Sequence, residues 1–376
     1  MKGQWVGEYS GTNQGVIIAN IDERPSCFEG VVFLNEKDVS LPSTVAFFTT
    51  PTAAKKFKFR TEGISPINPL TGLIDLWENV SRFYDGNVVI PEFADVNGAW
   101  SDEKLTLSWK TNIGTYGSCV LPYSNANQPS EIIPSVSDWN GFRSSVFKHE
   151  GRHFIFRGQN KPWRLRTSFH RAGRFNLHRF VFEDIPTLHK HLSARTKHLF
   201  NLDIPNENGA FFNLIQHHGY PTPLLDWSYS PYVAAFFAYR GISSEVAAHA
   251  KLEDRVRIYA FNQYLWKKDF NQLQHLLPAG PHVSIGEFLA VENERMIPQQ
   301  AISFITNMDD IEAYIKSRQV GDKQYLFAID LPVSNRDKVV QELDYMGVTA
   351  GSLFPGLDGA CEELKERNFK TCYKLG

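Results

Sequence analysis

Short runs of aromatic and β-branched residues, separated by glycine, asparagine and aspartate, dominate the first 121 residues of the chain. Runs of this length, interrupted by turn residues, are typical of strands joined in hairpins. Their spacing predicts a small antiparallel β-barrel or sandwich. The expected strands lie within 4–21, 30–34, 45–50, 57–61, 86–90, 99–108 and 117–121. Trp5, close to Gly7 and Tyr9, either closes the bottom of this barrel or lines the entrance of a ligand cavity, and the first interpretation is preferred.

The pattern changes after residue 121, where residues 122–137 are rich in proline, serine and asparagine and predict a linker. Beyond it, apolar positions with helical spacing are mixed with short apolar runs. Helices are expected within 138–147, 173–200, 210–218, 231–240, 337–345 and 359–367, and strands within 154–158, 224–226, 256–262, 290–306 and 325–331. Strands and helices without strict alternation predict an α+β domain over 138–376.

Two segments of this second domain place charged residues at the ends of apolar runs. Arg157 follows Phe154-Ile155-Phe156, and Asp226 follows Leu224-Leu225. A charge at the end of a core strand requires a partner, a ligand or water. Turn residues and aromatics flank both charges, so the two segments, 154–171 and 216–239, predict a lined pocket.

The same segments carry a resemblance to a known family. Arg157-Gly158-Gln159, followed by Trp163, Leu165, Ser168 and Arg171, resembles the opening of the FRG domain, which is named for its Phe/Tyr-Arg-Gly signature. A second block is similar over Gln216–Thr222 and Leu224–Ser228, and it continues through Ser230-Pro231 and Val233–Ala238. A third block is similar over Ser352–Gly359. The resemblance spans about 140–376, and it implies a toxin or anti-phage effector.

A more distant likeness concerns the order of the elements. A strand that ends in arginine, a strand with small polar residues before a Pro-x-Val-Ala-x-x-Phe helix, and a Glu-x-Glu strand together resemble the ADP-ribosyltransferase arrangement. That likeness implies that Arg157 contacts NAD, that Asp226-Trp227-Ser228 shapes the nicotinamide pocket and that Glu294 is catalytic. The sequence departs from the pattern at Asp226, where serine is expected. The FRG family also emphasises a glutamine in the late strand, here Gln299 or Gln300.

These likenesses and the residue chemistry give a candidate site. Arg157 and Glu294 are the expected catalytic residues, together with His217, which is either a general base or a core histidine. A carboxylate stabilises the positive charge that develops on ribose when nicotinamide leaves, and an arginine matches the geometry of phosphate oxygens. The other expected binding residues are polar or aromatic side chains of the two segments: Gln159, Gln216, Tyr220, Thr222, Asp226, Trp227 and Ser228.

Simpler interpretations remain beside these. Arg157 and Asp226 could form a buried structural ion pair, and Glu292 and Glu294 could share the solvated face of an edge strand. The leading function is NAD-dependent ADP-ribosyl transfer or NAD cleavage. A non-catalytic module that binds a nucleotide or peptide is the second candidate. A nucleic-acid effector is the third, because residues 161–198 are locally basic.

Composition narrows the picture. The chain of 376 residues has 42% hydrophobic and 21% charged residues and a net charge of −2, which is ordinary for a globular protein and argues against a generally nucleic-acid-coating surface. The spacing of Cys27, Cys119, Cys361 and Cys372 predicts reduced thiols, with no zinc site. No signal peptide or membrane-spanning stretch is expected, so the protein is expected in the cytoplasm. Its expected ligand is a small nucleotide, with a protein or nucleic acid as a possible acceptor.

Overall fold

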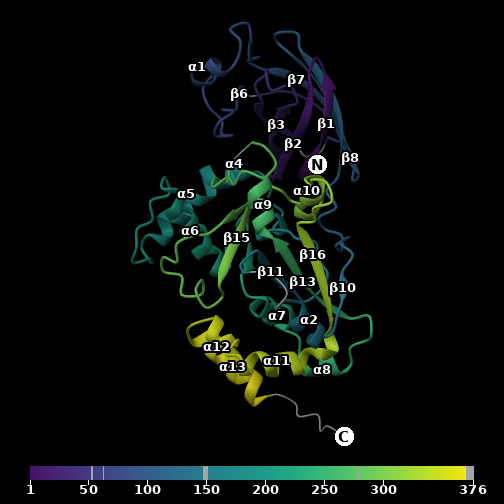
Figure 1. Ribbon diagram of the computed structural model, residues 1–376. Helices are drawn as coiled ribbons and strands as arrows, with labels where there is room; N and C mark the ends of the chain where they lie inside the picture. Colours follow the sequence, from purple (N-terminus) through teal and green to yellow (C-terminus); the bar gives the residue numbers. More distant parts are fainter. Residues whose placement is uncertain (52–53, 62, 147–150, 278, 370–376) are drawn as a thin grey trace.

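The computed structural model describes residues 1–51, 54–61, 63–146, 151–277 and 279–369. Two sheets, one from each half of the chain, carry the main hydrophobic clusters of the described residues (Figure 1). The first half contains almost only strands, and the second mixes strands with helices, which confirms the α+β class. Residue 147, at the end of the first expected helix, lies outside the described residues.

Within the described residues, nine antiparallel strands form a curled sheet in the order β5-β7-β8-β9-β1-β2-β3-β4-β6. The expected strands are confirmed except at 86–90, where the chain forms a loop, and at 99–108, where residues 101–103 form a turn between two strands. Burial alternates along β9, as expected for a sheet with one buried face. The strands are β1 (Gly3–Gly11), β2 (Gln14–Glu23), β3 (Cys27–Glu36), β4 (Thr44–Pro51), β5 (Lys56–Arg60), β6 (Ile64–Pro66), β7 (Ala94–Trp100), β8 (Lys104–Thr111) and β9 (Tyr116–Pro122), with the short helices α1 (Trp77–Val80) and η1 (Ser81–Phe83) after β6.

Trp5 lies in the core of this half-barrel, at the end that faces the second domain. Its ring is 1% exposed and lies 5.1 Å from the ring of Tyr123, and its Nε1 donates to the carbonyl oxygen of Met1 at 2.9 Å. Its neighbour Gln4 donates to the carbonyl oxygen of Asn307 in the second domain at 2.6 Å. The tryptophan therefore closes the bottom of the barrel, as the preferred interpretation predicted.

The segment expected to be a linker is ordered against both domains. Tyr123 forms a bridge with Trp5 of the barrel, and Pro129 forms one with Trp163 of the second domain. The strand β10 (Ser135–Val136) then pairs in parallel with β16 (Leu326–Pro332). Residues 122–137 are therefore part of the folded body.

In the second half, seven described strands form a sheet in the order β10-β16-β13-β11-β12-β15-β14. The helices α2, α7 and α11 pack on one face, and α9 and α10 pack on the other. The strands are β11 (Phe154–Gln159), β12 (Leu224–Ser228), β13 (Arg255–Asn262), β14 (Val283–Gly286), β15 (Ala301–Thr306) and β16 (Leu326–Pro332). The helical segments are α2 (Trp139–Val146), α3 (Ser168–Arg171), α4 (Leu177–Arg179), η2 (Phe180–Asp184), α5 (Ile185–Leu192), α6 (Pro205–His217), α7 (Pro231–Tyr239), α8 (Ser244–Ala248), α9 (Gln263–Asp269), α10 (Ile311–Ser317), η3 (Val333–Asn335), α11 (Arg336–Tyr345), α12 (Ala350–Leu353) and α13 (Leu357–Asn368).

The strand expected over 290–306 is shorter than predicted. Only β15 is extended, and residues 291–300 form consecutive turns. Glu292 and Gln300 adopt left-handed backbone conformations with φ of 53° and 47°, which interrupt a strand. Glu292 and Glu294 consequently do not share the face of an edge strand.

A buried carboxylate joins the two domains. Asp22, at the end of β2, has no exposed surface and accepts hydrogen bonds from the main-chain amides of Phe175 and Asn176 at 2.7 and 3.2 Å. It also accepts from Arg174 at 2.7 Å and from Arg179 at 3.4 Å. A buried charge needs this many partners, so the interface depends on the contacts of Asp22.

Candidate functional site

Arg157 lies where β11 separates from β12 while it stays paired with β13. The strand pairs with β13 along its whole length but with β12 only through Phe156 and Ser228. The next residue, Gly158, faces α7, and a Cβ there would lie 1.8 Å from the main-chain oxygen of Ala234. The Arg-Gly pair of the first segment thus has a packing reason, because only glycine allows α7 to approach this closely.

The Arg157 side chain is half-buried and makes few hydrogen bonds. Its Nη1 donates to the main-chain oxygen of Asp226 at 2.5 Å. Its Nε is enclosed and has no hydrogen-bond partner within the described part of the chain. Burial lowers the pKa of the guanidinium to about 10, against the opposing effect of the Asp226 carboxylate. The group is therefore charged at neutral pH and retains unused donors.

A chain of hydrogen bonds connects the two sequence segments next to Arg157. Asp226 Oδ1 accepts from Gln216 Nε2 at the end of α6, and Gln216 Oε1 accepts from the hydroxyl of Thr222. The amide of Thr222 donates to Ser168 Oγ at 3.0 Å, and the Ser168 hydroxyl donates to the Thr222 carbonyl oxygen at 3.2 Å. We call Arg157, Ser168, Gln216, Thr222 and Asp226 the Arg157 cluster. The predicted convergence of the two segments is present in the structure.

Arg171, at the end of α3, adds a second positive charge to the Arg157 cluster. Its Nη1 donates to the main-chain oxygen of Arg166 at 2.5 Å. Burial lowers the pKa of Arg171, the charge of Arg166 lowers it further, and the Asp226 carboxylate opposes both. Arg171 belongs to the first sequence block but was not among the expected site residues. Its position at the end of the polar segment 154–171 could have identified it as a site residue.

The structural ion pair considered for Arg157 and Asp226 has a different form. The guanidinium contacts the main-chain oxygen of Asp226, whereas the carboxylate accepts from Gln216. The second carboxylate oxygen, Oδ2, accepts no hydrogen bond from the residues that the structure describes. One oxygen of the carboxylate and several donors of the guanidinium thus have no hydrogen-bond partner among the described residues.

Two of the expected pocket residues are structural instead. Trp227 is 3% exposed, and its ring lies 4.7 Å from that of Phe304 in the hydrophobic core. Its ring packs within the core, so Trp227 does not line a binding pocket as expected. Ser228 is 5% exposed, and its hydroxyl donates to the main-chain oxygen of Gln299 at 2.7 Å. Gln299 Nε2 donates in turn to the main-chain oxygen of Leu353 at 2.9 Å, which connects the second and third sequence blocks.

His217 contacts a different set of residues from Gln216, its neighbour in α6. Its Nδ1 lies 2.7 Å from Asn293 Oδ1, and its main-chain oxygen accepts from Arg295 at 2.6 Å. Asn293 Nδ2 donates to Asn213 at 3.0 Å. With Nδ1 fixed as a donor by Asn293, Nε2 is the nitrogen that can accept a proton.

The remaining expected binding residues lie at the edges of the site. Gln159 Nε2 donates to the main-chain oxygen of Trp163 at 3.2 Å. Tyr220 packs against Phe180, with ring centroids 6.3 Å apart. Burial raises the pKa of Tyr220, and the nearest influential charges are Asp184 and then Arg174, which belong to the domain interface. Neither side chain forms a hydrogen bond with the Arg157 cluster in the described part of the chain.

Glu294, the expected catalytic carboxylate, is exposed and lies in the turns that precede β15. In the described part of the chain its side chain forms no hydrogen bond or ion pair with the Arg157 cluster. The carboxylate that the structure does place beside Arg157 is Asp226. Arg157 does not line any of the three hollows found among the described residues, so a pocket beside it stays a prediction.

The described residues include no group of three or more histidine, cysteine, aspartate or glutamate side chains that could hold a metal ion. Cys27, Cys119 and Cys361 are free thiols, and Cys372 lies outside the described residues. Among the described helices, none is both apolar enough and long enough to cross a membrane.

Comparison with known proteins gives one match. The family model described as FRG domain matches residues 152–246, which include both segments of the Arg157 cluster. A search of curated proteins and a search of solved structures each returned no match.

Proposed function

We propose that the FRG domain of this chain binds a pyrophosphate nucleotide, with NAD the leading candidate, at the Arg157 cluster and cleaves its nicotinamide–ribose bond. Cleavage leads either to hydrolysis or to ADP-ribosyl transfer. The observation that carries the proposal is a half-buried guanidinium with unused donors beside a half-free carboxylate. A toxin or defence role, and an ADP-ribosyltransferase-like fold, belong to the same proposal.

The role of Arg157 follows from its unsatisfied hydrogen bonds. A charged group that is largely removed from water and has one hydrogen bond is expensive for the folded state. A phosphate group would supply acceptors for the free N–H groups of the guanidinium, and arginine matches phosphate oxygens in a two-pronged geometry. Arg171, the second cation near Asp226, would add attraction for a diphosphate.

Asp226 is the carboxylate proposed to assist the reaction. When the bond between nicotinamide nitrogen and ribose carbon breaks, the electron pair leaves with nicotinamide and positive charge builds on the ribose. A carboxylate near that carbon stabilises the charge. Water or an acceptor hydroxyl then bonds to the carbon and releases its proton. Gln216 and Thr222 hold Asp226 in place through their hydrogen bonds.

A second candidate is a module that binds the nucleotide without cleaving it. It is favoured by one observation, namely that Glu294, the carboxylate implied by the ADP-ribosyltransferase likeness, is exposed in a turn. In that case the Arg157 cluster would recognise a ligand and the first domain would add specificity.

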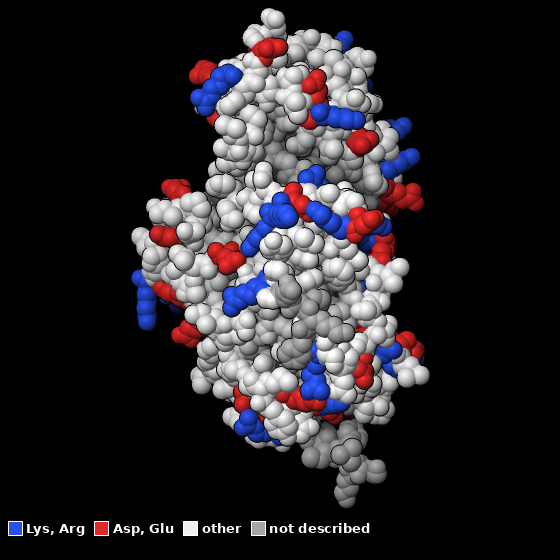
Figure 2. Space-filling view, in the orientation of Figure 1, with Lys and Arg blue, Asp and Glu red and all other residues white. Residues whose placement is uncertain are grey.

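The third candidate, a nucleic-acid effector, receives less support. Four of the arginines in the basic stretch 161–198 form ion pairs, which neutralise their charge: Arg164 with Glu131 and Asp310, Arg166 with Asp309, Arg174 with Asp22 and Asp184, and Arg179 with Glu183. Figure 2 shows positive and negative residues interspersed over the visible face. A surface that binds nucleic acid concentrates positive charge instead.

The test is to incubate the full chain with NAD, measure released nicotinamide, and measure NAD binding by calorimetry. Asp226→Asn is expected to lower turnover by about 100-fold or more, since a single charge-stabilising group contributes this much, with binding nearly unchanged. Glu294→Gln is the matched control, because it removes an exposed carboxylate outside the cluster, and it is expected to retain full activity. Circular dichroism and thermal melting confirm that each variant folds.

The outcomes separate the candidates. Binding of NAD that depends on Arg157 but is not followed by nicotinamide release would support the second candidate. Loss of activity in Glu294→Gln with retention in Asp226→Asn would show that the wrong carboxylate has been assigned. Neither binding nor cleavage of NAD by the wild-type chain would overturn the proposal.

A further inference from the structure

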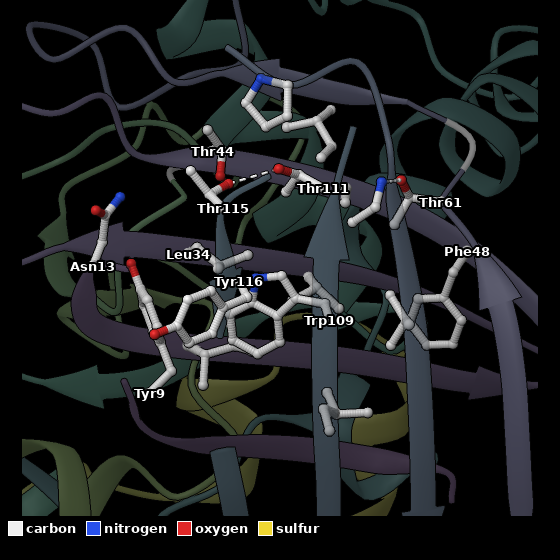
Figure 3. Close-up of a pocket in the computed structure, with 18 of the residues that line it drawn as sticks. Tyr9, Asn13, Leu34, Thr44, Phe48, Thr61, Trp109, Thr111, Thr115 and Tyr116 are labelled. Atoms are coloured by element: carbon white, nitrogen blue, oxygen red, sulfur yellow. Dashed lines mark hydrogen bonds between the residues drawn. The ribbon is translucent and has the colours of Figure 1, made fainter. Parts of the chain in front are cut away.

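The half-barrel of the first domain encloses a cavity of about 160 Å³ (Figure 3). Most of its wall is apolar and comes from the inner faces of strands β2, β3, β4, β5, β7 and β8. The wall includes Ile17, Leu34, Phe48, Leu107 and Trp109. The cavity is separate from the Arg157 cluster, since no residue of that cluster lines it.

Small side chains keep the cavity open. Ala19, Ala46 and Ala94 lie on the wall, on strands β2, β4 and β7, where larger residues would fill the centre of the barrel. Protein interiors are normally close-packed, and an unfilled apolar space of this size destabilises the fold. An apolar cavity of about 150 Å³ binds a molecule of the size of benzene. The space therefore has the dimensions of a site for one small apolar ligand.

Three polar side chains lie together at one side of the cavity. Asn13 Nδ2 donates to Glu36 Oε1 in a long contact of 3.4 Å, and Tyr9 packs against Trp109 with ring centroids 5.6 Å apart. Tyr9 is 5% exposed, and its hydroxyl oxygen has no well-aligned hydrogen-bond partner in the described residues. The same holds for Glu36 Oε2. Figure 3 shows Tyr9 and Asn13 on one side of the cavity and Phe48 on the other.

Unsatisfied polar atoms in an apolar enclosure indicate a missing partner, because native structures satisfy nearly all buried polar groups. Burial raises the pKa of Glu36, and the neighbouring Tyr9 hydroxyl and Asn13 amide offset this only in part. Burial also raises the pKa of Tyr9, which lies beside the Glu36 carboxyl. A ligand group that donates a hydrogen bond to Glu36 would supply the partner that Glu36 Oε2 lacks in the described residues.

The cavity extends to the end of the barrel that carries the β1–β2 turn. Its rim includes Thr12 and Asn13 of the β1–β2 turn and Thr115 and Tyr116 at the start of β9. The opposite ends of β1 and β2 carry Gln4 and Asp22, which contact the second domain. Tyr116 is 62% exposed at the rim. This end is the entrance that we infer for a ligand.

We propose that this barrel cavity binds a small apolar molecule of about six to ten non-hydrogen atoms whose polar end donates a hydrogen bond to Glu36. Alcohols and amines share this chemistry. A carboxylic acid of the same size does not fit, because its negative charge would face the Glu36 carboxylate at short range. The site does not depend on the function proposed for the Arg157 cluster.

The test uses benzyl alcohol, benzylamine and benzoate, which have the same ring and differ in the polar end. Binding to the full chain is measured by calorimetry and by the increase in melting temperature. Benzyl alcohol or benzylamine is expected to bind at least tenfold more tightly than benzoate. Glu36→Gln is expected to weaken the binding of benzylamine at least tenfold and that of benzyl alcohol much less, because only benzylamine is charged. Glu8→Gln, on the exposed face of β1, is the matched control and is expected to change neither.

Two variants fill the cavity, Ala19→Leu and Ala46→Leu, so that the test survives if one of them fails to fold. Either is expected to abolish binding of all three probes while nicotinamide release, if present, is unchanged. Binding that persists in a folded cavity-filled variant would overturn the proposal. Equal binding of benzoate and benzylamine, or binding of none of the three probes by the wild-type chain, would overturn it as well.

Discussion

Replacement of Arg157 by methionine tests whether this arginine serves the fold or a ligand. Methionine has a similar length and no charge, so it keeps most of the packing and removes the guanidinium. If Arg157 were a structural residue, its removal would destabilise the protein by about 3–5 kcal/mol, as for one partner of a buried pair. The structure leads to a different expectation.

The magnitude follows from two opposing effects. The pKa of Arg157 falls from 12.5 to about 10, which corresponds to roughly 3 kcal/mol of unfavourable free energy for holding the charge in the folded chain. The variant is relieved of this cost, but it loses the hydrogen bond to the main-chain oxygen of Asp226, worth about 1.5–3 kcal/mol for a charged donor. We expect the free energy of unfolding of Arg157→Met to lie within about 2 kcal/mol of the wild type.

The expected effect on binding is much larger. Two charged hydrogen bonds to a phosphate, at about 1.5–3 kcal/mol each, correspond to a loss of at least about 100-fold in affinity for NAD. Urea denaturation measures the stability and calorimetry the affinity. Arg257→Met is the contrasting control, because Arg257 is buried and binds both oxygens of Asp330 at 2.7 and 2.9 Å. That variant should lose about 3–5 kcal/mol. A comparable loss in Arg157→Met would refute the reasoning.

Three further changes test other parts of the structure. Burial lowers the pKa of His170 from 6.5 to about 4. The contribution of this residue to stability is therefore complete above pH 6.5, and it falls by roughly 3 kcal/mol as the pH drops toward 4. His170→Asn should flatten the dependence of unfolding free energy on pH, and replacement of the exposed His191 by asparagine should not. Asp22→Ala should cost about 3–5 kcal/mol and split one calorimetric transition into two, whereas a single unshifted transition would contradict the role of Asp22 at the interface. Gly158→Ala should destabilise by about 1–3 kcal/mol or more through contact with α7, while Gly86→Ala, with nothing within 4 Å of its Cβ, should be neutral in urea denaturation.

Apolar runs between turn residues were sufficient to predict most strands of the first domain, and helical spacing of apolar positions predicted the main helices of the second. It failed at 290–306, because the left-handed conformations of Glu292 and Gln300 have no signature in ordinary side chains. It also failed at the expected linker, because β10 is defined by pairing with β16, nearly 200 residues later in the chain. Composition alone cannot reveal a partner at that distance.

The candidate site was predictable in part. Charges at the ends of apolar runs correctly predicted that Arg157 and Asp226 lie close to each other. Gln216 and Thr222, from the same segments, join them through hydrogen bonds. Trp227 could have been excluded from the sequence, because neighbours in a strand point to opposite faces and Asp226 and Trp227 cannot both line one site. The hydrogen-bond deficit at the half-barrel cavity was not visible in the sequence, since it arises from the way Tyr9 and Glu36 meet across separate strands.

The ordered course of residues 122–137 limits how this architecture can be rearranged. Tyr123 and Pro129 form bridges with different domains, and β10 completes the edge of the second sheet. The segment is therefore a rigid connection between the two domains. An unrelated domain that replaced the amino-terminal half would need a connecting segment with equivalent contacts to both domains. Insertions in this stretch would shift β10 out of register with β16, so the chain is expected to tolerate length changes at its hairpin tips far better than between its halves.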